Sequence, residues 1–71
     1  MGVADYDITV AGELPREFAA AFAPFSVESA RGTSTIRAEQ IDDAALLGLL
    51  ARMSDLALAL LRVERVESRP H

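Results

Sequence analysis

The side chains that could perform acid–base chemistry are carboxylates, because the sequence holds one histidine and no cysteine. Asp5 and Asp7 share a parity in an alternating segment, so both would project from one face of a strand. Asp7 or Glu28 could act as the general base of a small isomerase or cyclase if a closed pocket raised its pKa. Charge pairing of Asp7 with Arg37 and Arg62 across a solvated sheet explains the same pattern without catalysis. Both interpretations need a sheet.

Nucleophilic and metal chemistry have less support. A serine or threonine nucleophile needs a neighbouring base, and the one imidazole belongs to His71, in a polar tail over 68–71 that we expect to be flexible. Asp42 and Asp43 diverge by about 100° on a helix. An N-cap and a first-turn acid explain both carboxylates. We therefore predict no catalytic residue, no metal site and no cofactor.

Composition narrows the classes of partner. Seventy-one residues support one core, and we expect a single domain over 1–67. The net charge is −4 and the seven cations, all arginine, are dispersed, which argues against binding to nucleic acid or to an anionic membrane. No apolar run approaches the roughly 20 residues of a membrane span, and the first residues lack the pattern of a signal peptide. The expectation is a cytoplasmic protein.

Apolar periodicity places these side chains on six elements. A period of two predicts strands, a spacing of three and four predicts helices, and Gly or Pro separates them. Arg31 and Gly32 suit a primed two-residue hairpin turn, and Asp42 suits a helix N-cap. The predicted elements are a strand over 6–12, a helix over 15–23, strands over 25–30 and 33–39, a helix over 43–57 and a strand over 58–66.

Each predicted element has an apolar face. In the hairpin, Val27 would lie opposite Ile36 and Phe25 opposite Ala38 on the buried side, with Glu28 opposite Thr35 and Ser26 opposite Arg37 on the other. In the last strand Leu60, Arg62 and Glu64 would face outward. The remaining inward positions are Tyr6, Ile8 and Val10; Leu14, Phe18, Ala21 and Phe22; Leu46, Leu49, Leu50, Met53, Leu56 and Ala57; and Ala59, Leu61 and Val63.

The order β, α, β, β, α, β predicts an α+β fold, the ferredoxin-like sandwich. Its antiparallel sheet would have the spatial order 4-1-3-2, with two helices on one face. Small cores gain stability from association, so we expect a homo-oligomer, most simply a dimer. The candidate contacts are the open face of the sheet, an edge strand, or the side of the second helix opposite its leucines, made by Ala44, Leu47, Gly48 and Ala51. A mid-helix Gly costs about 1 kcal/mol relative to Ala, which close approach by another backbone would offset.

Three segments carry a resemblance to known proteins: Ile41–Leu50, Ser54–Leu56 and Leu60–Val66. They resemble short uncharacterised bacterial proteins, common in actinobacteria, whose second half follows the pattern VDQAALHGLL…DLGLPLLSVRRVE. That pattern has His where this chain has Leu47 and Gly where it has Ala57. The resemblance implies the fold and no established activity. Without a Gly there, the second helix must end through a less favourable left-handed residue or a different turn.

A weaker similarity is to ACT-type regulatory domains, which share the topology. Gly12 matches the glycine of the loop after their first strand, and the similarity implies a small effector bound near Gly12 and Glu13. Three functions therefore stay open. The first is a non-enzymatic module that self-associates or docks on a partner protein, the second is a metabolite-binding domain, and the third is the small isomerase or cyclase.

Overall fold

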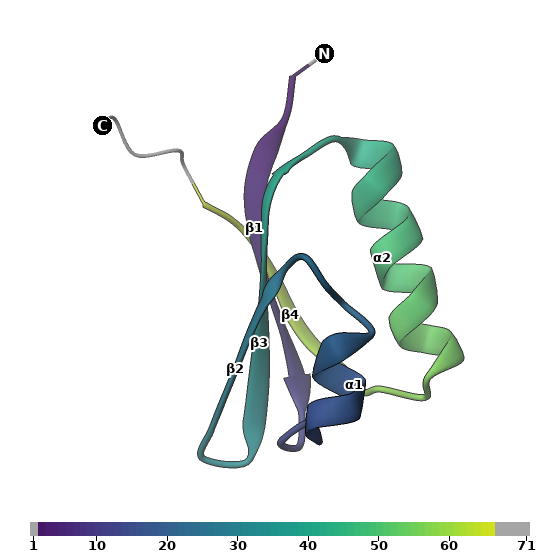
Figure 1. Cartoon of the computed structure of the whole chain (residues 1–71). Coiled ribbons are helices and arrows are strands. Elements are labelled where there is room, and N and C mark those ends of the chain that lie inside the picture. The colour runs from purple at the N-terminus through teal and green to yellow at the C-terminus, as the bar shows by residue number, and fades with distance from the viewer. Residues whose placement is uncertain (1, 67–71) are drawn as a thin grey trace.

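The computed structural model describes residues 2–66 of the chain, so the predicted tail and His71 lie outside the described residues. Four strands form one sheet in the order β2-β3-β1-β4, and each neighbouring pair is antiparallel (Figure 1). Both helices lie on the same side of that sheet. This confirms the predicted α+β ferredoxin-like fold, with its strand order read from the opposite edge. The elements are β1 (Ala4–Ala11), α1 (Arg16–Ala20), β2 (Ser26–Ala30), β3 (Thr33–Ile41), α2 (Asp43–Asp55) and β4 (Leu60–Val66).

The hairpin between β2 and β3 has the predicted turn and register. Arg31 and Gly32 both have positive φ, 57° and 80°, as a type I′ turn requires. The two strands pair Val27 with Ile36, so both bury the same side of the hairpin. The polar pairs Glu28–Thr35 and Ser26–Arg37 follow on the other side. Phe25 lies just before β2 and packs against the core.

Capping interactions fix both ends of α2. Asp42 is the N-cap, and its Oδ1 accepts a hydrogen bond of 2.8 Å from the backbone N–H of Ala45. At the other end Ala57 takes the left-handed conformation, with φ at 59°. The N–H of Leu58 donates to the carbonyl of Met53 at 3.0 Å, the six-to-one bond of a Schellman motif. The helix thus ends through the less favourable alternative, a left-handed alanine in place of a glycine.

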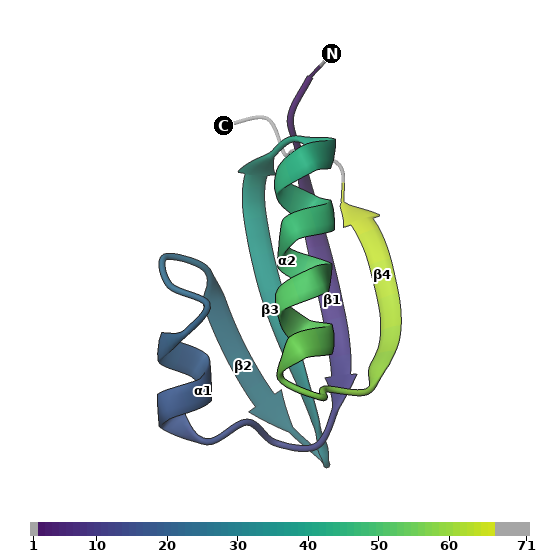
Figure 2. The same ribbon diagram turned by 90° about the vertical axis from the view of Figure 1, so that its right-hand side faces the viewer.

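The core lies between α2 and the middle of the sheet. Leu49 and Met53 of α2 are buried against the inward side chains of the two central strands, and α2 runs above β3 and β1 (Figure 2). Phe22, just after α1, is buried in the same core. The buried side chains from the central strands are Ile8, Val10, Ile36, Ala38 and Ile41.

α1 is shorter than predicted. The predicted helix over 15–23 is an α-helix only over Arg16–Ala20, and none of its own residues is buried. From Ala21 onward, N–H groups donate three residues back, as Phe22 does to Ala19 at 3.1 Å. Such tighter turns have about three residues each, so side chains leave the stripe that a period of 3.6 would give. Phe22 is therefore buried while Phe18 and Ala21, predicted to face inward, are exposed.

The prediction for the faces of β4 was wrong in part. Val63 pairs with Ile8 of β1, on the helix side of the sheet as predicted. Between Thr9 and Val10, however, the pairing shifts, and Leu60 instead of Leu61 lies opposite Val10. An extra residue in one strand reverses the alternation beyond it. Leu60 therefore shares the helix side of the sheet with Val63, although it was predicted to face away.

A buried hydroxyl joins the loop after β1 to the hairpin. Ser34 of β3 is fully buried, and its Oγ donates to the carbonyl of Gly12 at 2.8 Å. The same oxygen accepts from the backbone N–H of Leu14 at 2.9 Å. Ser29 Oγ lies 2.8 Å away and must be the donor, because the one proton of Ser34 is already used. One side chain thus satisfies two backbone groups of the loop and links three segments.

We predict that Ser34→Ala lowers the free energy of unfolding by about 1–3 kcal/mol, because it leaves the Gly12 carbonyl and the Leu14 N–H without their partner. Urea unfolding followed by circular dichroism measures the change. Ser29→Ala is the matched control, since it removes one hydroxyl that is itself exposed, and we expect it to cost less than about 1 kcal/mol. Equal losses in the two variants would contradict the account of Ser34.

Candidate functional site

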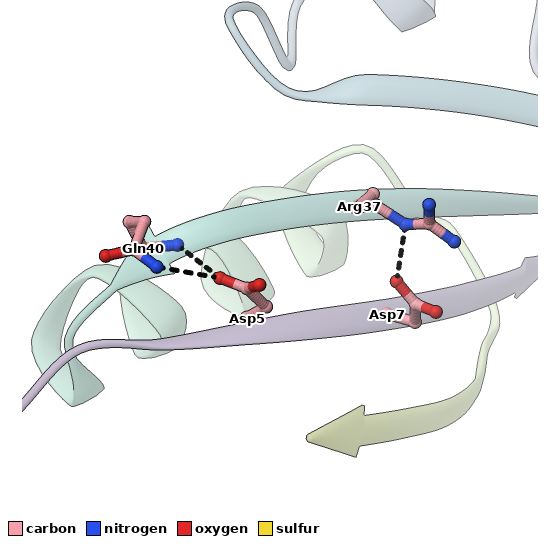
Figure 3. A network of polar contacts seen from close by, with 4 residues as sticks. All are labelled: Asp5, Asp7, Arg37 and Gln40. Carbon is pink, nitrogen blue, oxygen red and sulfur yellow. Dashed lines mark hydrogen bonds and ion pairs between the residues drawn. The ribbon is translucent and has the colours of Figure 1, made fainter. Parts of the chain in front are cut away.

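The face of the sheet opposite the helices carries the polar side chains singled out in the sequence. Nε of Arg37 donates to Oδ1 of Asp7 at 3.1 Å, which confirms the predicted pair (Figure 3). Asp5 does not join that pair. Its Oδ1 accepts from the backbone N–H of Gln40 at 2.8 Å, where Gln40 has a positive φ of 57° and the β1–β3 register shifts. Asp5 therefore supports an irregularity of the backbone.

Beside these residues the polar face continues to both edges of the sheet. Arg62 of β4 lies opposite Thr9, and its nearest carboxylate partner is Glu64 at 3.3 Å, not Asp7. On the other side, Ser26, Glu28, Thr35 and Arg37 line a shallow depression that is open to solvent. Polar cross-strand pairs cover this face, and each such pair contributes about 0.2–1 kcal/mol to the stability of a sheet.

This polar face offers little for proton transfer. The hydrogen bond from Arg37 to Asp7, and the charge of Asp7, raise the pKa of Arg37 above its ordinary value, so its guanidinium stays charged. Asp7 is already bound to that guanidinium. Glu28 lines the depression, where solvent reaches it. A general base is favoured by a closed, water-poor site, whereas Asp7 is bound to Arg37 and Glu28 is exposed to solvent.

The loop that contains Gly12 and Glu13 is tied to the hairpin by its own polar groups. The N–H of Gly12 donates to the carbonyl of Gly32 at 2.7 Å, and its carbonyl accepts from Ser34. Oε2 of Glu13 accepts from the N–H of Gly32 at 3.1 Å. The positive φ of Gly12, 87°, lets the chain turn there. Polar groups of both residues are thus engaged with the hairpin.

Among residues 2–66, no group of three or more His, Cys, Asp or Glu side chains is arranged to hold a metal ion. Within the same range, no helix has the length and apolar character needed to cross a membrane.

The predicted interface residues of α2 all lie on its exposed side. Ala44, Gly48 and Ala51 point away from the sheet, and a Cβ placed on Gly48 would meet no atom within 4 Å. The folded chain itself therefore gives no reason for a glycine at this position. Leu47 differs from these three small residues, because it is a large apolar side chain that is 66% exposed.

Leu47 lies on the flank of α2 that faces β4. Nη1 of Arg52 donates to the carbonyl of Ala21 at 2.9 Å, so the flank with Arg52 faces α1. At 100° per residue, Leu47 lies about 140° from Arg52, beyond Leu50 on the other flank. Figure 2 shows α2 between α1 on one side and β4 on the other. Leu47 thus leans toward the side of the helix where β4 lies.

Three apolar side chains of β4 are also exposed. Leu60 is 48% exposed, Leu61 57% and Val63 38%, although all three are apolar. We call Leu47, Leu60, Leu61 and Val63 the apolar strip. It is the largest departure from the sequence prediction, which placed Leu61 and Val63 in the core. Single exposed apolar residues are normal, whereas contiguous exposed apolar surface marks a region that another molecule covers in many proteins.

Comparison with known protein families assigns the chain to one of them. A family described as a domain of unknown function (DUF8691) matches residues 5–64. The chain belongs to the DUF8691 family. No curated protein and no solved structure matches it. Residues 5–64 run from β1 to β4, so the DUF8691 match includes the polar face, the Gly12 loop and the whole apolar strip.

Sequence patterns found some parts of this surface and missed others. They found the Asp7–Arg37 pair and the exposure of Leu47, both of which follow from periodicity. They missed Ser34, although a serine at an inward parity of β3 was a usable signal. They also missed the exposure of β4, because alternation shows which side a residue faces and not whether anything covers that side.

We predict that Gly48→Ala raises the free energy of unfolding by about 0.5–1 kcal/mol without changing the association state, since the methyl group meets no atom and Ala favours a helix. Ala57→Gly is the matched opposite exchange. It should also stabilise, because it relieves a left-handed alanine. Urea unfolding tests both variants. Weaker self-association of Gly48→Ala would show that another backbone approaches the outer side of α2.

Proposed function

We propose that this chain is a non-enzymatic protein-interaction module that acts by self-association, most simply as a symmetric dimer. The observation that supports the proposal is the apolar strip, because Leu47, Leu60, Leu61 and Val63 are exposed in the isolated chain. Covering such side chains is worth about 25 cal/mol for each Å² removed from water. A second copy that presents the same strip would gain this free energy on both sides.

The size of the domain supports the same proposal. Chains of this length bury only about 60% of the surface that unfolding exposes, so their stability is small. Association adds apolar contacts that the single core cannot provide. Two-fold dimers are the commonest closed assembly of identical chains. Self-association would therefore stabilise the fold as well as carry the function.

The two other functions have weaker support. An effector near Gly12 and Glu13 would have to compete with the hydrogen bonds that join this loop to Gly32 and Ser34. An isomerase or cyclase would need Asp7 or Glu28 in a closed pocket, but Asp7 binds Arg37 and Glu28 lines an open depression. A thermal-shift panel of small metabolites would detect the first of these functions directly.

Sedimentation velocity tests the proposal. We expect the wild-type protein to sediment as a dimer at about 100 µM, above the dissociation constant of even a modest interface of about −7 kcal/mol. A monomer at that concentration would overturn the proposal.

We predict that Leu47→Glu shifts the protein toward monomer while it stays folded, because Leu47 is outside the core but inside the apolar strip. A buried unpaired carboxylate at the interface should weaken association at least tenfold. Ala45→Glu is the matched control, since Ala45 is exposed on the same helix and belongs neither to the strip nor to the interface predicted from the sequence. Sedimentation and circular dichroism of both variants give the result. A dimer of undiminished affinity for Leu47→Glu would remove this residue from the interface.

A further inference from the structure

The free edge of β4 has a sequence that is complementary to itself. β4 lies at one edge of the sheet, so one side of its backbone has no partner strand within the described residues. Arg62 and Glu64 lie on the polar side of the sheet, two residues apart, with Val63 between them on the helix side. If two copies of β4 lie antiparallel and centred on Val63, each Arg62 meets the partner's Glu64. Both charges then gain an oppositely charged neighbour from the other chain.

We propose that two copies of this chain associate by antiparallel pairing of β4 with β4, about a two-fold axis through Val63. This inference rests on the proposed function and names its interface. The two four-stranded sheets would join into one sheet of eight strands. Main-chain hydrogen bonds would complete the unpaired edge, as in other complexes that form by strand addition.

Charge selects this register over its neighbours. Centring the pair on Arg62 or on Glu64 places like charges directly opposite each other, which is destabilising. Centring it on Arg65 has the same fault. In the Val63 register, the two valines face each other on the helix side, and the methylenes of Arg65 lie beside the partner's Leu61. The charged groups thus favour one alignment and penalise the adjacent ones.

The apolar strip selects the orientation. A two-fold axis perpendicular to the sheet puts both α2 helices on the same side, so the two strips join into one apolar surface between the helices. A two-fold axis within the sheet would put the helices on opposite sides, and each strip would stay exposed. The Val63 register has the perpendicular axis, because residues directly opposite in an antiparallel pair share a face.

The other edge of the sheet lacks these features. β2 has the sequence Ser26-Val27-Glu28-Ser29-Ala30, with one charged residue and no cation to match it. Centring a β2 pair on Glu28 would oppose two carboxylates. Centring it on Val27 would set Glu28 against serine only. The proposal therefore predicts association through one edge, which gives a closed dimer and no chain of copies.

A charge exchange tests the register. Arg62→Glu alone sets two glutamates against each other, and Glu64→Arg alone sets two arginines against each other, so each variant should self-associate at least tenfold more weakly than wild type. A mixture of the two variants restores both opposite-charge pairs, and a heterodimer should form. The double variant Arg62→Glu/Glu64→Arg should recover self-association, which also shows that the exchanged strand folds. Sedimentation velocity and native mass spectrometry distinguish the species, and circular dichroism reports folding.

The result separates this inference from the proposed function. If wild type is a dimer but the single variants associate as well as wild type, the β4 register is wrong and self-association stands. The same conclusion follows if mixing gives no heterodimer or the double variant stays monomeric. Arginine and glutamate on an edge strand also protect monomers from pairing. In that case wild type is monomeric at every concentration, and both proposals fail together.

Discussion

α2 is the one long helix in the described part of the chain, and it has to cover a sheet of four strands. A helix with its side chains is about 10–12 Å wide, whereas neighbouring strands lie about 4.8 Å apart. It therefore covers about two strands, and in this fold these are β1 and β3, whose Ile8, Val10, Ile36 and Ala38 are buried. The width of α2 therefore determines which strands of the sheet remain exposed on the helix side.

The two edge strands, β2 and β4, differ in how their helix-facing sides are covered. On the β2 side, α1 lies beside the sheet (Figure 2) and the hydroxyl of Ser34 contacts that of Ser29 in β2, although α1 itself buries none of its residues. On the β4 side no helix of the described residues covers the sheet, and Leu60, Leu61 and Val63 are left in contact with solvent. The asymmetry leaves β4 as the edge strand with large exposed apolar side chains. The apolar side chains of β4 that α2 does not cover could be removed from water by contact with a second chain.

The sequence could predict the features that depend on local periodicity. Asp42 as an N-cap, the turn at Arg31 and Gly32, and the pairing of Val27 with Ile36 follow from short-range rules, and the structure confirms them. The length of α1 was wrong because the chain forms three-residue turns after Ala20, which are frequent at helix ends and are not distinguished from an α-helix by apolar spacing over so few residues. The shift in β4 was missed because an extra residue in a strand leaves no mark on composition.

The candidate surface was predictable only in pieces. Leu47 was found because it departs from the leucine stripe of α2, but Leu61 and Val63 of β4 were assigned to the core and Leu60 to the opposite face. Their exposure depends on the width of the helix layer, which is a property of the whole fold. The sequence shows that Arg62 and Glu64 carry opposite charges. Pairing of β4 with a second β4 can be inferred from them only once β4 is known to be an edge strand.

Amide hydrogen exchange of the wild-type protein tests the central claim most directly, because it reports on each edge of the sheet separately. Rates measured at low and at high protein concentration would be compared for β4 and for β2. If β4 pairs with β4, its outward amides become more protected as the concentration rises, while the outward amides of β2 exchange at an unchanged rate. Protection of β4 that does not depend on concentration, or protection that rises on β2 instead, would contradict the claim.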